Sequence, residues 1–162
     1  RSNMLTEPNF DMTTKLLYNI IWFNSNRTKI MKGYKTNIEK DTLDNNNFRK
    51  VLYTSKHVQL VLMRLWPHEE IGEEIHYEND QFFRIEGGHG KCIIDDSEYE
   101  IKDGDAIVIP TGSKHNIINI DTQTDLKMYT LYAPPHHKDG ILRHTKKEAE
   151  ENAPEFDGKT TE

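Results

Sequence analysis

The sequence has a single cysteine, no long apolar stretch and fewer basic than acidic side chains, and each of these features argues against a class of protein. Cys92 is the single cysteine among 162 residues, so no disulfide can form within the chain. It lies in an apolar stretch, where a free thiol packs as a small hydrophobic side chain. A reduced thiol is typical of a reducing compartment, and we therefore expect a cytoplasmic protein.

The longest apolar stretch runs from residue 16 to residue 23 and is interrupted by Asn19. A helix needs about 20 apolar residues to cross a bilayer, so no membrane association is expected. The chain lacks a strongly basic leader and an Ala-x-Ala cleavage signal, which argues against a secretory signal peptide and leaves an atypical targeting segment open. Its 21 basic side chains are dispersed and outnumbered by 27 acidic ones, which predicts no nucleic-acid partner.

The composition of the chain changes near Met31. Residues 1–30 show no sustained strand alternation, and we interpret them as an N-terminal extension that either packs outside the domain or is disordered. Residues 31–162 have the length of a single domain. The asparagine-rich segment 44–47 within them predicts a loop.

Short β-runs separated by turn residues fill the chain from Phe48 onward, which predicts an antiparallel sandwich or barrel of the all-β class. The predicted strands are Arg49–Thr54, His57–Leu65, Glu74–His76, Gln81–Glu86, Gly90–Ile94, Glu98–Lys102, Ala106–Ile109, His115–Ile120 and Leu126–Tyr132. Thr145 followed by Glu148 is a capping-box pattern, and it predicts a short C-terminal helix from Lys146 to about Asn152.

The strongest functional signal is the segment that begins at Gly104 and ends at Asn119. Between these residues it contains Pro110, then Gly112 after one residue, then His115 after two. Gly104 permits a tight turn into a strand, Pro110 ends that strand, and Gly112 tolerates a positive φ. His115 then begins the next strand, with its imidazole inside the barrel.

This segment resembles the second conserved motif of the cupin superfamily at every defining position. The first cupin motif belongs upstream, where four residues separate His76 from Gln81 and six separate Gln81 from Gly88, as in that motif. Two ligand positions differ, because Glu74 replaces the first histidine and Gln81 replaces the carboxylate. The opening glycine of the motif falls on His68.

We predict that Glu74, His76, Gln81 and His115 bind one divalent metal. Positions 74 and 76 differ by two, so both side chains point to one face of a strand. A carboxylate, two imidazoles and an amide carbonyl suit Fe, Mn, Zn, Ni or Co rather than Ca. Two alternatives stay open, namely that Glu74 is a solvated charge beside Glu73 and that Gln81 is a hydrogen-bonding core amide.

The other histidines and the aromatic side chains carry weaker signals. We expect solvated side chains for the histidines near turns or strand ends, His57, His68 and His89. We interpret His136 and His137, which follow two prolines, as part of a solvated loop, with a surface metal site as the alternative. The aromatic side chains expected in the core or barrel wall are Trp66, Phe82 and Phe83.

From Met31 to Glu162 the chain is similar to a widespread group of small single-domain cupins, or monocupins. The segments that carry this similarity are residues 47–54, 80–86, 129–136 and 156–162. The resemblance implies an RmlC-like jelly roll, also called a double-stranded β-helix, with an internal metal and often a homodimer joined through sheet edges. It implies no single activity, because one fold hosts many functions.

The first functional hypothesis is a metal-dependent enzyme that acts on a small polar molecule. Two histidines and one carboxylate match the facial triad of non-haem iron oxygenases, which favours a dioxygenase-like reaction. Phosphomannose isomerases also bind metal through two His, one Glu and one Gln, which favours a sugar-phosphate isomerase such as a mannose-6-phosphate isomerase-like enzyme. The alternatives are a non-catalytic cupin that binds a small molecule and a protein whose metal only braces the barrel.

Overall fold

The structure is a computed structural model that describes residues 11–13 and 30–162. Within it, Gly33–Glu162 form a compact unit. The predicted N-terminal extension, residues 1–30, lies almost entirely outside the described residues, and the boundary at Met31 stays a prediction. Among the described residues, no helix has the length and apolar character needed to cross a membrane.

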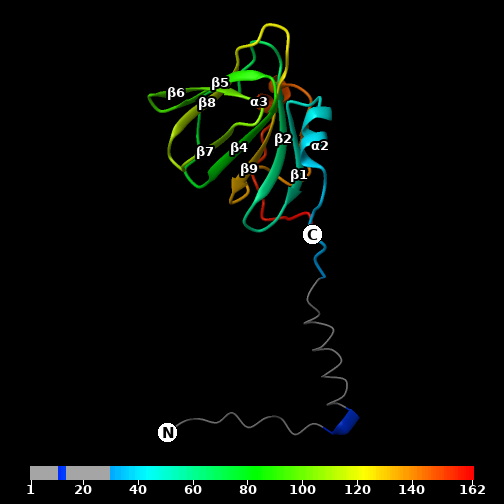
Figure 1. Cartoon of the computed structure of the whole chain (residues 1–162). Helices are drawn as coiled ribbons and strands as arrows, with labels where there is room; N and C mark the ends of the chain where they lie inside the picture. Colours follow the sequence, from blue (N-terminus) through cyan, green and yellow to red (C-terminus); the bar gives the residue numbers. More distant parts are fainter. Residues whose placement is uncertain (1–10, 14–29) are drawn as a thin grey trace, which may run out of the picture. The chain divides into compact units, whose positions relative to one another are not determined.

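Two antiparallel sheets make up the fold, which confirms the predicted all-β class (Figure 1). The larger sheet has the strand order β10-β1-β2-β9-β4-β7, and the smaller has the order β3-β8-β5-β6. The strands are β1 Arg49–Thr54, β2 Gln59–Leu65, β3 Glu74–Ile75, β4 Asp80–Gly87, β5 His89–Ile94, β6 Ser97–Lys102, β7 Ala106–Ile109, β8 Lys114–Asn119, β9 Leu126–Ala133 and β10 Leu142–Arg143.

Every predicted strand is present, with ends shifted by at most two residues. Within Gly33–Glu162 the structure also contains two elements that the sequence did not predict. One is the short edge strand β10; the other is helix α2, Ile38–Asp44. The side chain of Asn37 accepts a hydrogen bond from the Lys40 amide at the start of α2, a common N-cap arrangement. Helix α2 contacts β2, β4 and β9 of the larger sheet.

The predicted C-terminal helix is confirmed as α3, Lys146–Glu151. The hydroxyl of Thr145 accepts a hydrogen bond from the Glu148 amide at 3.2 Å. The carboxylate of Glu148 reaches back one residue further than in a standard capping box and accepts from the His144 amide at 2.7 Å. The pattern of Thr145 and Glu148 therefore predicts the start of the helix correctly.

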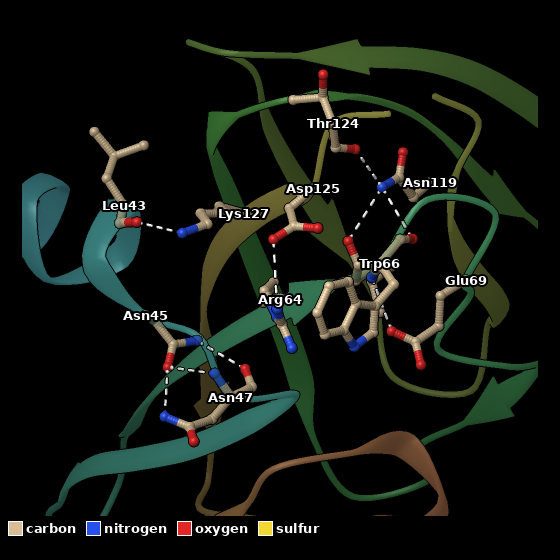
Figure 2. Close-up of polar contacts among 11 residues, drawn as sticks. Leu43, Asn45, Asn47, Arg64, Trp66, Glu69, Asn119, Thr124, Asp125 and Lys127 are labelled. Carbon is tan, nitrogen blue, oxygen red and sulfur yellow. Dashed lines mark hydrogen bonds and ion pairs between the residues drawn. The ribbon is translucent and has the colours of Figure 1, made fainter. Parts of the chain in front are cut away.

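The core contains the inward-facing apolar side chains of both sheets, since side chains alternate between the two faces of a strand. Phe83 is fully buried, as predicted. The expectation of a core position for Trp66 is wrong, because its side chain is 50% exposed. Its ring instead covers the buried guanidinium of Arg64, whose Cζ lies 3.7 Å from the ring centroid (Figure 2).

Cys92 is fully buried in this core, and burial raises the pKa of its thiol to about 11. Only the thiolate attacks disulfide reagents, so at pH 8 roughly one thiol in a thousand is reactive. We expect a disulfide reagent such as DTNB to label the native protein at least ~100-fold more slowly than the urea-unfolded protein. Stoichiometric labelling of the native protein within minutes would contradict this prediction.

Two positions of the first motif have a left-handed backbone. Gly88 has a φ of +89°, and a Cβ at this position would lie 2.3 Å from the carbonyl oxygen of Asp125. Glycine is therefore required for the approach of β9 to this turn. His68, which replaces the opening glycine of the motif, keeps the glycine-type conformation with a φ of +64°.

Asn119, the last residue of the second motif, has a structural role at the opposite end of β8 from His115. It is fully buried, and its amide nitrogen lies 3.1, 3.0 and 2.8 Å from the carbonyl oxygens of Leu65, Trp66 and Thr124 (Figure 2). Its amide oxygen accepts from the backbone of Asp121 at 3.0 Å. One side chain thus joins the end of β2 to the loop before β9.

We expect Asn119→Asp to lower the free energy of unfolding by about 3–5 kcal/mol, because it removes the donor and leaves a buried charge facing several carbonyl oxygens. Urea unfolding followed by circular dichroism measures this change. The control is the same amide-to-carboxylate exchange at Gln123, which is exposed. Equal stabilities of the two variants would remove the proposed role of Asn119.

Candidate metal centre

The structure brings the four predicted ligands together inside the barrel. Glu74 on β3 lies directly opposite His115 on β8, and His76 follows β3 by one residue. Gln81 comes from β4 in the other sheet. One ligand atom from each of Glu74, His76 and His115 lies within 4.8 Å of the other two, and His115 Nε2 lies 3.2 Å from Gln81 Oε1.

The loop of the second motif positions His76. The amide of Gly112 and the hydroxyl of Thr111 both donate to the carbonyl oxygen of His76, at 2.7 and 3.0 Å. Gly112 adopts a φ of +83°, as the sequence predicts. The Asp95 carboxylate accepts from the Lys114 amide at 3.0 Å and fixes the start of β8 beside His115. These hydrogen bonds fix the backbone at His76 and next to His115.

The hydrogen bonds of His115 and Gln81 leave two lone pairs facing each other. His115 Nδ1 lies 3.1 Å from the carbonyl oxygen of Ser113, which can only accept. In the neutral ring that donates this hydrogen bond, Nε2 carries no proton. Gln81 Nε2 donates to the Thr130 hydroxyl at 3.1 Å, which turns Oε1 toward His115. In this tautomer His115 Nε2 and Gln81 Oε1 are two acceptors 3.2 Å apart, an arrangement that a cation bound to both would stabilise.

His76 adds a third atom that needs a partner. Its Nε2 is buried and makes no hydrogen bond among the described residues, and it lies 3.4 Å from Glu74 Oε2. A buried polar atom without a partner is costly. Together with the lone pairs of His115 and Gln81, this orphaned nitrogen shows that the residues present fit a divalent metal ion.

The protonation states also suit metal binding. Burial lowers the pKa of His115, which keeps the imidazole neutral, and the neutral ring is the form that binds a metal. Burial alone would raise the pKa of Glu74, but the contact with His76 and the charge of Arg49 together hold that pKa below its usual value. Glu74 therefore stays ionised.

The interpretation of His136 and His137 as a solvated loop is wrong. The His136 ring centroid lies 4.5 Å from that of His76, and His137 is 5% exposed. Burial lowers the pKa of His136 to about 4. His136 thus packs against a predicted ligand, and His137 packs against the buried ring of Tyr132 with centroids 5.1 Å apart.

The burial of this histidine pair comes from residues distant in the sequence. The Gln59 side chain accepts from the His137 amide at 2.9 Å and donates to the His137 carbonyl at 2.7 Å. The Phe156 amide donates to the carbonyl of His136 at 2.9 Å, so the C-terminal tail runs along the pair. The sequence near Pro134 contains no local pattern that predicts these contacts, because their partners are distant in the chain.

A pocket of about 560 Å³ opens next to the candidate centre and has His76 and His136 in its wall. It lies between the β3–β4 connection, the segment around Pro134 and the C-terminal tail. Its lining is mixed and includes Tyr77, Glu78, Asn79, Glu155 and Phe156. A pocket of this size admits a small molecule.

The chain is similar to known proteins in sequence and in fold. Residues 61–132, which include all four predicted ligands, match the family model described as Cupin domain. The chain is 44% identical over 124 residues to Uncharacterized protein YrkC of Bacillus subtilis, which covers 73% of this chain and 66% of that protein. It is 43% identical over 112 residues to Uncharacterized protein L612 of Acanthamoeba polyphaga mimivirus, which covers 67% of this chain and 70% of that protein.

Among solved structures, the crystal structure of BH2720 from Bacillus halodurans has a TM-score of 0.73 and 38% sequence identity to this chain. The match covers 75% of this chain and 96% of that structure. Together with the match to the cupin family model and the two antiparallel sheets, this similarity confirms the predicted jelly roll.

Proposed function

This chain belongs to the cupin family, and from that premise we propose that it is a metal-dependent enzyme that acts on a small polar molecule. The observation that carries the proposal is the convergence of His76 Nε2, His115 Nε2 and Gln81 Oε1 on one point beside the Glu74 carboxylate. The neighbouring pocket, with its partly polar lining, supports access of a small molecule to this point.

Glu74, His76, Gln81 and His115 would hold the metal, which when bound supplies Lewis acidity or redox chemistry. The protein's part is to orient these groups and to limit access of water. Ser113 fixes the ring of His115 and Thr130 fixes the amide of Gln81. The buried ring of Tyr132 packs against His76 with centroids 5.7 Å apart, and His136 covers the same ring next to the pocket.

The test begins with elemental analysis of the protein as isolated. Protein loaded in turn with Fe(II), Mn(II), Ni(II), Zn(II) and Co(II) is then assayed for oxygen consumption with enediols and diols and for interconversion of sugar phosphates. Turnover that depends on one metal supports the enzyme and separates a dioxygenase-like from an isomerase-like reaction. Metabolites that raise the melting temperature without any turnover would favour the non-catalytic binding protein instead.

Two finer features belong to the same proposal. We expect a cytoplasmic location, because Cys92 is unpaired and reduced thiols are typical of that compartment. We also expect a homodimer joined through sheet edges. The edge strand β6 is exposed along most of its length and offers backbone groups to a second copy. Analytical ultracentrifugation tests the dimer.

A further inference from the structure

Arg49 is a buried cation beside the candidate metal centre. It lies on β1 and is 6% exposed, so its guanidinium points into the barrel. Its Nη2 lies 4.0 Å from Glu74 Oε1, and its Nε is buried without a hydrogen-bond partner in the described part of the chain. The sequence pattern predicts Arg49 at the start of a strand and indicates no function for it.

The protein alone satisfies this guanidinium poorly. Arginine carries five N–H donors in a rigid plane, and a separation of 4.0 Å is the outer limit of an ion pair rather than a hydrogen bond. Burial of a charge with few partners is costly and is usually compensated by a bound ion or ligand. Glu74 is an incomplete partner, because its other oxygen faces His76.

The guanidinium lies at the same end of the barrel as the predicted ligands. Burial is the main cause of the lowered pKa values of His136 and His137, and the charge of Arg49 lowers both further. It also lowers the pKa of Glu74, because it faces Oε1 of that carboxylate while His76 faces Oε2. Arg49 therefore lies beside the predicted ligand Glu74, at the candidate metal centre.

The charges of the site favour an anion. The charges of the Glu74 carboxylate and the Arg49 guanidinium cancel each other. Histidine and glutamine bind a metal as neutral groups, so the whole charge of a divalent ion would stay uncompensated. The acidic side chains that line the pocket, Glu78 and Glu155, are both exposed. Water and salt screen exposed charges far more than buried ones.

We infer that Arg49 binds a carboxylate group of the molecule that reaches the metal centre, so that the substrate is a small carboxylate. A carboxylate presents two oxygens in one plane and matches the planar fork of a guanidinium. The inference deepens the proposed function and rests on it, because both place one small molecule at the same centre.

Arg64 provides a matched control within the same barrel. It is also buried, at 5% exposure, and its Nε also lacks a hydrogen-bond partner among the described residues. Its local partners are closer than those of Arg49: Asp125 lies 3.5 Å from its Nη1, and its Cζ lies 3.7 Å from the centroid of the Trp66 ring (Figure 2). For Arg49 the corresponding distances are 4.0 Å to Glu74 and 5.5 Å to the centroid of the Phe48 ring. We therefore assign no ligand to Arg64.

Isothermal titration calorimetry with malonate and with its neutral diamide, malonamide, tests the inference. The wild type, Arg49→Met, Arg49→Lys and Arg64→Met are each titrated in the metal-free and the zinc-loaded form, with zinc content measured in every sample. We expect the wild type to prefer malonate, and Arg49→Met to weaken malonate binding by about 10- to 100-fold without weakening malonamide. Arg49→Lys keeps a part of the preference, and Arg64→Met keeps all of it.

A wild type that binds malonate no better than malonamide overturns the inference, as does an unchanged preference in both Arg49 variants. If Arg49→Met does not fold by near-UV circular dichroism, Arg49→Lys decides. If the protein binds zinc but the Arg49 variants bind malonate as tightly as the wild type does, the carboxylate site is refuted and the proposed function is unaffected. A wild type that binds no metal refutes the proposed function, and the metal-free titrations then decide the role of Arg49 by the same criterion.

Discussion

Replacing His115 with alanine is expected to reduce bound divalent metal from a full equivalent to a small fraction of one. His115 Nε2 faces both Gln81 Oε1 and the Glu74–His76 pair, so its loss removes the ligand that joins the two sheets. Loss of a group that merely orients a ligand already costs about 10- to 100-fold in metal affinity. We therefore expect a larger loss, measured by elemental analysis after dialysis against a defined metal buffer.

The same variant should lose the stabilisation that metal gives the wild type. A metal at 100 times its dissociation constant stabilises a protein by about 2.7 kcal/mol, and this rise in melting temperature should be absent in His115→Ala and in His76→Ala. His57→Ala is the control, because His57 is exposed and distant from the motifs. Unchanged metal content in His115→Ala would remove the metal assignment altogether.

The sequence could predict those parts of the site that depend on local spacing. Gly104, Gly112 and His115 take the turn, the positive φ and the strand position that their separation requires. Positions 74 and 76 share a face because a strand has a period of two. The convergence of Glu74, His76, Gln81 and His115 follows from these local rules together with the family resemblance, whereas their binding of a metal stays a prediction.

The sequence could not predict the groups that reach the site from distant segments. Arg49 begins β1, and the side of the sheet to which its side chain points depends on the pairing of β1 with β2 and β10. A shift of one residue in that register would place the guanidinium in solvent. His136 and His137 are buried by Gln59 and by the C-terminal tail. These contacts are tertiary and leave no periodic pattern in the chain.

Gln81→Glu is expected to lower the stability of the metal-free protein and to raise its affinity for metal. In the metal-free protein it places a second carboxylate near Glu74 in a buried site, where Gln81 itself is 2% exposed. Like charges and burial both oppose ionisation, and we expect the free energy of unfolding to fall by about 2–3 kcal/mol. Thermal unfolding in the presence of a chelator measures this loss.

With metal, the new carboxylate should bind the ion more tightly than the amide does, by about tenfold or more. The Thr130 hydroxyl, now 3.1 Å from Gln81 Nε2, can donate to the second oxygen of the carboxylate and keep it in place. The control is Gln123→Glu, the same change at an exposed position. Affinity for zinc, measured by competition with a chelator, should therefore rise only in the buried variant.

The additional negative charge should also weaken the binding of an anion. If Arg49 and the uncompensated charge of the metal attract a carboxylate, Gln81→Glu should bind zinc more tightly and malonate more weakly than the wild type. A Gln81 that serves only as a hydrogen-bonding core amide would give a different result, because its replacement would lower stability in both forms without improving zinc affinity. The direction of the change in zinc affinity thus separates a ligand at position 81 from a structural amide.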